Sequence, residues 1–317
     1  MRSGAQTLIL LAAPLNVLLL QALAEGPKQQ AELRRETGLP PQTTLRAQLK
    51  RLAELGAIEK HRRNRFPGVL EYELTASGEE LLRVVETLEH WLGMSENGPL
   101  PLGGSAAKSV VKALAEGWST TMLRVLAARP LSLTELDRII GSLSYPSLER
   151  RLAALRVAGL IEPHTGDGRG TPYGATKWLR YGVAPLAAAT RWERRRSPDI
   201  TAPVGRLDVE AALLLAVPLL RLPAEFSGAC RLGAEIVNGK SRLAGAMVSI
   251  RRGEVAGCST NLQGHPDAWA LGSISAWLNA LLEHDVDSLE LGGDCRFVRT
   301  LIERFHKTLF SVPAESR

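Results

Sequence analysis

The chain has 317 residues, enough for two or three domains of ordinary size. Its hydrophobic content of 45% and charged content of 23% exclude a wholly disordered protein. The net charge of +6 favours a polyanionic partner without requiring one. Cys230, Cys258 and Cys295 form no CxxC pair, so we expect no disulfide framework or structural zinc site, and a cytoplasmic location.

Residues 8–24 form an apolar run that resembles a signal peptide. Pro14 and Asn16 interrupt this run, only Arg2 precedes it as a positive charge, and it is short for a membrane span. We therefore expect a helix over residues 16–24 that covers the core of a folded domain and ends at Gly26-Pro27.

Residues 29–74 have the pattern of a winged helix-turn-helix, which places one helix in the major groove of DNA. The pattern predicts a helix over residues 28–37, a turn at Leu39-Pro40-Pro41, and a third helix that starts at Thr43 or Thr44 and ends at Gly56. The apolar face of the third helix carries Leu45, Leu49, Leu52 and Leu55. The opposite face supplies the predicted DNA contacts Gln42, Thr43, Thr44, Arg46, Ala47 and Lys50.

Residues 57–61 and 69–74 are predicted to form the two strands of the wing. The loop between them contains Arg62, Arg63 and Arg65, which are suited to phosphates or to a minor groove. The alternative is a solvated loop with ordinary surface charge. The following helix, residues 75–91, can be capped by Thr75 or Ser77, and either packs against a partner helix or closes its own domain.

After a Gly- and Pro-rich linker, the same apolar and turn positions recur 103 residues later without a gap, which predicts an internal duplication. The positions Leu45, Leu49, Leu52, Gly56, Ile58 and Glu59 recur as Leu148, Leu152, Leu155, Gly159, Ile161 and Glu162. The predicted organisation is a first domain at 1–93, a linker at 94–105, a second domain at 106–196, a linker at 197–205, and a third domain at 206–317.

The second copy has a third helix that starts at Tyr145 or Pro146 and ends at Ala158, and a wing tip that is rich in glycine. Its predicted DNA contacts are Ser147, Arg150, Arg151 and Arg169. Glu149 replaces Arg46 and would repel phosphate, so this copy either binds DNA more weakly or serves as a scaffold. A helix over residues 178–192 follows the wing.

The first domain resembles the HxlR-type winged-helix regulators of bacteria. The resemblance lies in residues 18–27, in the third helix, and in the string Tyr72-x-Leu74-Thr75-x-x-Gly78. The second domain keeps the third helix but lacks the Tyr-x-Leu-Thr string. The resemblance implies homodimers on paired half-sites of double-stranded DNA, and hence for this chain a monomeric pseudo-dimer or a homodimer.

The last third of the chain has a different pattern. Residues 207–219, 273–284 and 296–310 are predicted helices, and residues 225–237, 242–251, 254–260 and 289–291 are predicted strands. Turns are predicted at Asn238-Gly239 and Arg252-Gly253. The whole chain is thus a mixed α+β protein, with two winged helix-turn-helix domains followed by an antiparallel sheet covered by helices.

This third domain resembles the sterol-carrier-protein-like domains in residues 225–228, in Ala268-Trp269, and in the string from Leu289 to Asp294. The resemblance implies an apolar cavity and a small hydrophobic ligand. The implied contacts are Met247, Trp269, Ile274, Trp277, Leu278, Leu281, Phe297, Leu301 and Phe305. The alternative is that these residues fill an ordinary core.

No catalytic set is evident. The six histidines are scattered, without a second ligand at a recognised metal spacing, and Cys258 and His265 have no third partner. We therefore expect a non-enzymatic, sequence-specific transcriptional regulator without cofactor or metal, modulated by a hydrophobic ligand. The alternative is a lipid- or metabolite-binding protein whose winged helices mediate protein contacts. Nothing in the sequence supports an enzyme that acts on a hydrophobic metabolite.

Overall fold

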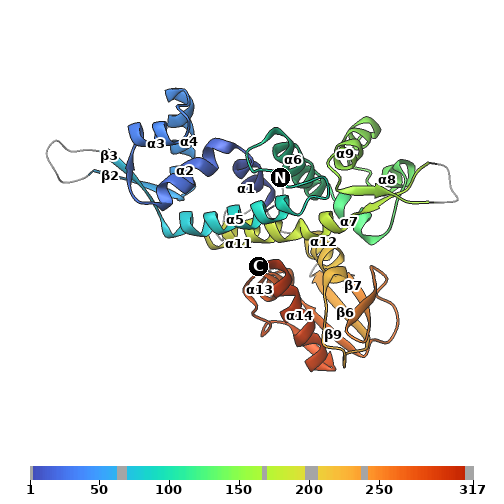
Figure 1. Cartoon of the computed structure of the whole chain (residues 1–317). Coiled ribbons are helices and arrows are strands. Elements are labelled where there is room, and N and C mark those ends of the chain that lie inside the picture. Colours follow the sequence, from blue (N-terminus) through green and yellow to red (C-terminus); the bar gives the residue numbers. More distant parts are fainter. Residues whose placement is uncertain (1–2, 63–69, 166–169, 197–205, 237–241, 311–317) are drawn as a thin grey trace.

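The computed structural model describes residues 3–62, 70–165, 170–196, 206–236 and 242–310. Three units are visible in Figure 1: an N-terminal unit in blue and cyan, a middle unit in green and yellow-green, and a C-terminal unit in orange and red below them. Two long helices cross the centre of the molecule and separate the C-terminal unit from the outer helices of the other two units.

Within its described residues, the N-terminal unit contains five helices and a small sheet with the strand order β1-β3-β2. Its elements are α1 (Ala5–Leu11), α2 (Pro14–Ala24), β1 (Lys28–Gln29), α3 (Gln30–Glu36), α4 (Gln42–Glu54), β2 (Ile58–Arg62), β3 (Leu70–Leu74) and α5 (Ala76–Gly93). The N-terminal apolar run thus forms two helices instead of one, because Pro14 starts a new helix at its first position. None of the described helices alone is long and apolar enough to span a membrane, whereas α1 and α2, bent by 80°, reach that length only together.

The helix-turn-helix is built from α3 and α4. The side chain of Gln29 and that of Glu32 form a capping box at the start of α3. Leu45, Leu49 and Leu52 are buried on the inner face of α4, as their spacing predicts. Burial of this face fixes which side of the helix is left for a partner.

After its first helix, the middle unit has a similar order of elements, except that an isolated bridge between Leu131 and Tyr173 stands in place of β1 and the last helix is divided. Its elements are α6 (Ser105–Ser119), α7 (Met122–Ala128), α8 (Leu133–Ile139), α9 (Tyr145–Val157), β4 (Ile161–Pro163), β5 (Tyr173–Ala175), α10 (Lys177–Tyr181) and α11 (Val183–Arg196). The helices α8 and α9 begin and end 103 residues after α3 and α4. A capping box of Ser132 and Glu135 starts α8, at the positions of Gln29 and Glu32.

The hairpin of the middle unit is two residues shorter than that of the N-terminal unit, since Ile58 pairs with Leu74 but Ile161 pairs with Ala175. Equivalent positions after the hairpin are therefore 101 residues apart. Tyr173-x-Ala175-Thr176 then corresponds to Tyr72-x-Leu74-Thr75. The expectation that the middle unit lacks this string was wrong for its tyrosine and threonine, because a constant offset of 103 misaligned them.

Both threonines act in the same way. The Oγ1 of Thr75 accepts a hydrogen bond from the Gly78 N–H and donates one to the Gly56 carbonyl. The Oγ1 of Thr176 likewise accepts from the N–H of Leu179. The Oγ1 of Thr176 also lies within hydrogen-bond distance of the Gly159 carbonyl, just after α9. Each threonine thus caps a helix and ties it to the end of α4 or of α9. The expected helix over residues 178–192 is divided at Gly182 into α10 and α11.

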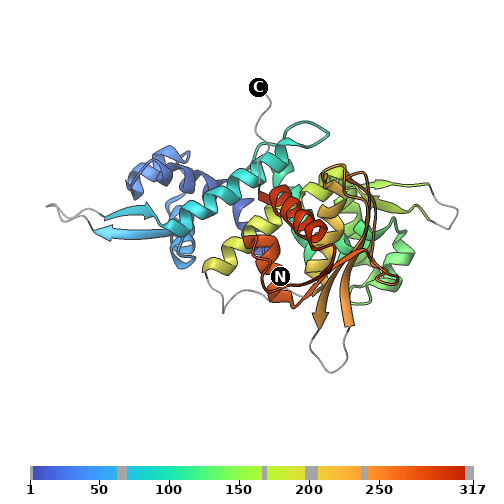
Figure 2. The same cartoon turned by 90° about the horizontal axis from the view of Figure 1, so that it is seen from below.

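The long helices α5 and α11 run antiparallel to each other and join the two units. The indole N–H of Trp91, near the end of α5, donates to the Trp178 carbonyl at 3.0 Å. The indole N–H of Trp192, near the end of α11, donates to the Ser77 carbonyl at 2.8 Å. Trp192 and Trp178 lie 101 residues after Trp91 and Ser77. The two hydrogen bonds therefore occupy equivalent positions, as in a two-fold symmetric dimer. The hairpins β2–β3 and β4–β5 point away from each other at opposite ends of this pair (Figures 1 and 2).

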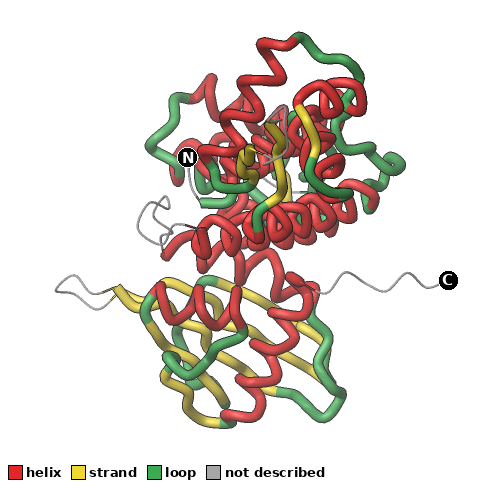
Figure 3. Tube along the Cα trace, turned by 90° about the vertical axis from the view of Figure 1, so that its left-hand side faces the viewer, coloured by secondary structure: helices red, strands yellow, loops and turns green. Residues whose placement is uncertain are grey.

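The C-terminal unit contains a five-stranded sheet with helices on one face (Figure 3). Its elements are α12 (Arg206–Ala216), the short 3₁₀ helix η1 (Val217–Leu219), β6 (Gly228–Ile236), β7 (Arg242–Arg251), β8 (Glu254–Ser259), β9 (Ala268–Gly272), α13 (Ile274–Glu283), β10 (Glu290–Gly293) and α14 (Cys295–Phe310). The Arg252-Gly253 turn is confirmed, with φ values of 49° and 77°. The Asn238-Gly239 turn lies outside the described residues.

The sheet has the strand order β10-β9-β6-β7-β8, and β6 and β9 pair in parallel. The expectation of a purely antiparallel sheet was therefore wrong. After β8 the chain returns across the sheet and enters β9 on the free side of β6, in the same direction as β6. Residues 260–267, which connect β8 to β9, form neither helix nor strand, and nothing in their sequence indicates that the chain passes to the other side of β6.

Charged side chains connect the C-terminal unit to the central helix pair. The carboxylate of Glu283 on α13 accepts hydrogen bonds from Arg191 and Arg195 on α11. Arg195 also pairs with Glu80 on α5, at 2.8 Å. Arg194 on α11 also donates to Oδ1 of Asn279 on α13, at 3.1 Å. The carboxylate of Glu283 is thus one of several polar links between the C-terminal unit and the helix pair that holds the other two units together.

Candidate nucleic-acid interface

The outer face of α4 is the best-defined candidate surface for DNA. All six residues that the sequence analysis placed on it are exposed, namely Gln42, Thr43, Thr44, Arg46, Ala47 and Lys50. Lys50 makes one long ion pair with Glu54, at 3.7 Å, in which both side chains remain mostly exposed. Such a pair contributes little to stability, so Lys50 is available to a partner. The neighbouring Arg51 is exposed as well and was not predicted.

The wing adds further cations beside α4. Arg62 is exposed at the end of β2, whereas Arg63 and Arg65 lie outside the described residues. Lys60 is exposed two residues earlier, on the same side of β2 as Arg62. It was not among the predicted contacts, which in the wing were confined to the arginines of the loop. The signal was present, since alternate residues of a strand share one face.

The other face of the same hairpin is acidic. Nε2 of His61 lies 3.2 Å from an oxygen of Glu59 and 3.0 Å from an oxygen of Glu73. Glu59 and Glu73 are directly opposite each other in the sheet register. These three ligand atoms all lie within 4.8 Å of one another. The wing is therefore cationic on one face and rich in metal-ligand atoms on the other.

The helix α9 presents a different surface, although it lies on the same side of the molecule as α4 (Figure 1). Arg150 is exposed, as predicted, but Ser147 is half-buried and Arg169 lies outside the described residues. The prediction that Arg151 is exposed was wrong. Its side chain is only 20% exposed and points toward α6, where it pairs with Glu116 at 3.8 Å.

The positions of Arg46, Lys50 and Arg51 are occupied in α9 by Glu149, Ala153 and Ala154. Val157 follows on this face and is 82% exposed. Together with the start of α6, these residues line an open groove of about 580 Å³. The groove is lined by Ser105, Ala106, Ser109, Val110, Arg150, Ala153, Ala154, Val157 and Ala158. The face of α9 that would meet a DNA groove is thus largely apolar.

Most of the predicted ligand contacts in the C-terminal unit are packed in its core. Five of them are buried, namely Trp277, Leu281, Phe297, Leu301 and Phe305, while Ile274 and Leu278 are half-buried. The indole N–H of Trp277 donates to the Gly233 carbonyl at 2.7 Å, and Phe297 stacks on Phe226. These contacts are those of a close-packed interior.

Met247 and Trp269 were wrongly assigned to the helix-covered side of the sheet. Their strand neighbours Ala246, Val248, Ala268 and Ala270 are fully buried, so alternation places Met247 and Trp269 on the opposite face. Both residues are register partners of Arg231 there. They therefore do not face the same space as Trp277 or Phe305.

A small apolar cavity does lie beside two of the predicted residues. Leu278 and Leu281 border a space of about 40 Å³ between α6, α11, α12, α13 and α14, to which Ser3 also contributes. This space can hold a water-sized molecule, but ligand sites for small molecules usually have about 300–1,000 Å³. Any larger ligand would require α13 or α14 to move.

Cys230 is buried and Cys258 is half-buried, and both thiols are poor nucleophiles. Burial raises the pKa of the Cys230 thiol to about 12. Burial also raises the pKa of the Cys258 thiol to about 12, against the opposing effect of the nearby Arg180. Cys295, in contrast, is exposed.

Comparison with known proteins identifies part of the chain. Residues 10–97 match the model of the HxlR-like helix-turn-helix family. The reduced form of the transcriptional regulator YodB from B. subtilis is similar to this chain at 28% sequence identity, over 28% of this chain and 88% of that chain, with a TM-score of 0.27. None of the curated proteins matches the chain. Residues 10–97, which contain the α3–α4 pair, the wing and α5, thus form an HxlR-like helix-turn-helix domain.

Proposed function

We propose that the chain is a sequence-specific, DNA-binding transcriptional regulator. The observation that carries this proposal is the outer face of α4. It exposes Arg46, Lys50 and Arg51 within an HxlR-like helix-turn-helix domain, while the leucines of its inner face are buried. A helix of this kind can enter the major groove with its cations on base edges and phosphates. Lys60 and Arg62 of the wing would meet the adjacent backbone.

The middle unit is a second winged helix, and the two units form an intramolecular pseudo-dimer. The support is the shared order of elements, the equivalent capping boxes, and the equivalent hydrogen bonds of Trp91 and Trp192. The two halves are unequal, since α9 lacks the cations of α4. We therefore expect one half-site of the operator to be read through bases and the other to contribute little sequence discrimination.

The C-terminal unit is a sterol-carrier-like domain that modulates DNA binding when it takes up a small hydrophobic ligand. The support is its sheet with helices on one face, the apolar cavity beside Leu278 and Leu281, and the link from Glu283 to α11. A ligand that opens this cavity would move α13, which carries Glu283. It would act on DNA binding only if it prefers one arrangement of the units over the other.

A titration of the full chain with fluorescent duplex DNA, repeated at several salt concentrations, tests the proposal. The DNA should first be selected from a random library. Arg46→Ala and Lys50→Ala should weaken binding, and each lost phosphate contact should reduce the slope of log K against log salt by about 0.9. Arg299→Ala, which changes an exposed arginine on α14 of the C-terminal unit, is the control and should leave both quantities nearly unchanged. No sequence-selective binding, or equal effects of all three variants, would contradict the proposal.

A second candidate is a lipid- or metabolite-binding protein whose winged helices contact other proteins. The apolar groove between α6 and α9, with Val157 exposed, is the observation that favours it. The salt series separates the two functions. An affinity for DNA that hardly changes with salt would mean that few phosphates are contacted, and would favour protein contacts.

A further inference from the structure

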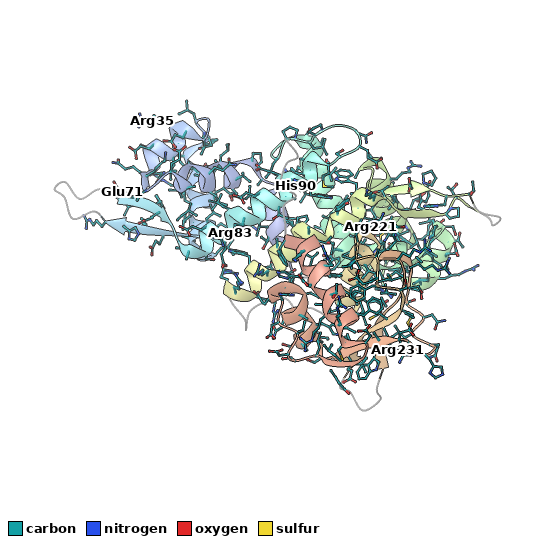
Figure 4. The ribbon with its side chains drawn as sticks, turned by 60° about the horizontal axis from the view of Figure 1, so that its bottom comes forward. Arg35, Glu71, Arg83, His90, Arg221 and Arg231 are labelled. Carbon is teal, nitrogen blue, oxygen red and sulfur yellow. The ribbon has the colours of Figure 1, made fainter. Side chains whose placement is uncertain are left out.

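The acidic face of the N-terminal hairpin has the geometry of a metal site. Glu59 and His61 lie two residues apart on β2 and share one face, and Glu73 lies opposite Glu59 on β3. The hairpin can be found in Figure 4 by the label of Glu71, the register partner of His61 on β3. Because all three residues belong to one antiparallel ladder, the backbone hydrogen bonds of the sheet fix the relative positions of their Cα atoms.

A bound cation would relieve the repulsion between the carboxylates of this cluster. Like charges directly opposite each other in a sheet are destabilising, and the register places Glu59 against Glu73. The ion pairs in the described part of the chain give both carboxylates the same partner, Nε2 of His61. A single ring nitrogen has one N–H to donate, so it cannot satisfy two carboxylates fully. A divalent cation would interact with both.

We propose that Glu59, His61 and Glu73 bind a divalent transition-metal ion, with zinc as the preferred class. One imidazole nitrogen and two carboxylate oxygens are ligands that zinc accepts, usually with water in the fourth position. Bonds of about 2.0–2.2 Å in a tetrahedral site place neighbouring ligand atoms roughly 3.3–3.5 Å apart. The observed separations of 3.2 Å and 3.0 Å from Nε2 need only small side-chain movements to reach this spacing.

The middle unit provides a natural comparison. Glu162 and His164 occupy the positions of Glu59 and His61, but Gly174 replaces Glu73. A Cβ atom at Gly174 would lie 2.5 Å from Nε2 of His164, so the imidazole covers the place of a third side chain. The middle unit thus keeps two ligands and lacks the carboxylate that completes the site.

Metal binding would change the charge of the wing. Two carboxylates on one face would be neutralised, while Lys60 and Arg62 remain on the other. The wing would then repel phosphate less, and the affinity for DNA would rise. This consequence, unlike metal binding itself, rests on the proposed function.

The first experiment uses the full chain, free of any tag and treated with a chelator, without DNA. Zn²⁺ binding is measured by calorimetry, and Co²⁺ binding by its visible absorption. The unmodified chain should bind one ion, and His61→Ala and Glu73→Gln should each weaken binding at least about tenfold. His164→Ala and Glu162→Gln should bind as the unmodified chain does. Circular dichroism checks that each variant is folded. If His61→Ala or Glu73→Gln is not folded, Glu59→Gln, which changes the third ligand, is used in its place.

Equal Zn²⁺ affinity in the unmodified chain, His61→Ala and Glu73→Gln would overturn the proposal, as would no binding at all. A second experiment measures DNA affinity with and without saturating Zn²⁺. If the first experiment succeeds, a rise in affinity that is absent from Glu73→Gln supports the effect on the wing. If the chain binds Zn²⁺ at this cluster but does not bind DNA, the metal site stands and the proposed function fails.

Discussion

The hydrogen bonds between α5 and the α10–α11 segment predict how strongly the two helical units depend on each other. Trp91 is buried, stacks on Trp178 with ring centroids 5.2 Å apart, and donates its indole N–H to the Trp178 carbonyl. Trp91→Phe leaves that buried carbonyl without its donor, which costs about 1–3 kcal/mol. Weaker stacking adds about 0.5–1.5 kcal/mol. We expect a total loss of about 1.5–4.5 kcal/mol in the free energy of unfolding.

The equivalent change, Trp192→Phe, should cost about 1–3 kcal/mol, because it also removes an indole hydrogen bond. Among the described residues the ring of Trp192 lies against the guanidinium of Arg196 and not against a second indole. Urea unfolding followed by far-UV circular dichroism measures both losses. Trp269→Phe is the control, because Trp269 is half-buried on the outer face of the C-terminal sheet. If Trp91→Phe unfolds at the same urea concentration as the unmodified chain, the contact between α5 and the α10–α11 segment does not stabilise the two units as the structure indicates.

Three further substitutions and modifications give sharp outcomes. Gly78→Ala should destabilise the N-terminal unit by about 1–3 kcal/mol in thermal unfolding, because a Cβ there would lie 2.0 Å from a backbone carbonyl, although alanine favours helices. The backbone N–H of Ser132, the guanidinium of Arg129 and the hydroxyl of Ser132 all donate hydrogen bonds to the Glu135 carboxylate. These bonds lower the pKa of Glu135 to about 2, from an ordinary value of 4.5. The stability that Glu135 provides should therefore be complete above about pH 4.5 and decline as the pH falls toward 2, so the difference in Tm between the unmodified chain and Glu135→Gln should shrink at pH 3. At pH 8, an alkylating reagent should modify Cys295 in the native chain, whereas Cys230 should react only after unfolding, as mass spectrometry would show.

Much of the fold could be predicted because its signals are local. The leucine spacing of α4, the Thr75 cap of α5 and the Gly-containing turn at Arg252-Gly253 act within a few residues, and the structure has them where the sequence placed them. The start of α4 was placed one or two residues too late, since the helix begins at Gln42 and has no side-chain cap. The parallel pairing of β6 and β9 could not be predicted, since it depends on a crossing between strands that are distant in the chain. Register across a sheet is decided by tertiary packing, which a linear pattern does not contain.

The candidate sites show the same division. The exposed face of α4 follows from helical periodicity, so all six of its predicted residues are exposed. Arg151 has the same periodicity but points inward, because Glu116 on α6 provides a partner that the sequence of α9 does not reveal. The Glu59–His61–Glu73 cluster was missed for a related reason. Its third member comes from the opposite strand, and the separation along the chain matches no recognised metal spacing.

The central claim is that α4 reads the sequence of DNA. It is tested most directly by the affinities of the unmodified chain and of Arg46→Ala for a selected operator and for each of its single-base variants. The unmodified chain should discriminate by about 1–3 kcal/mol per base pair within one half-site, and Arg46→Ala should lose that discrimination at one position while keeping it elsewhere. If Arg46→Ala, and then Thr43→Ala and Lys50→Ala, weaken binding equally for every sequence, α4 does not read bases and the account is wrong.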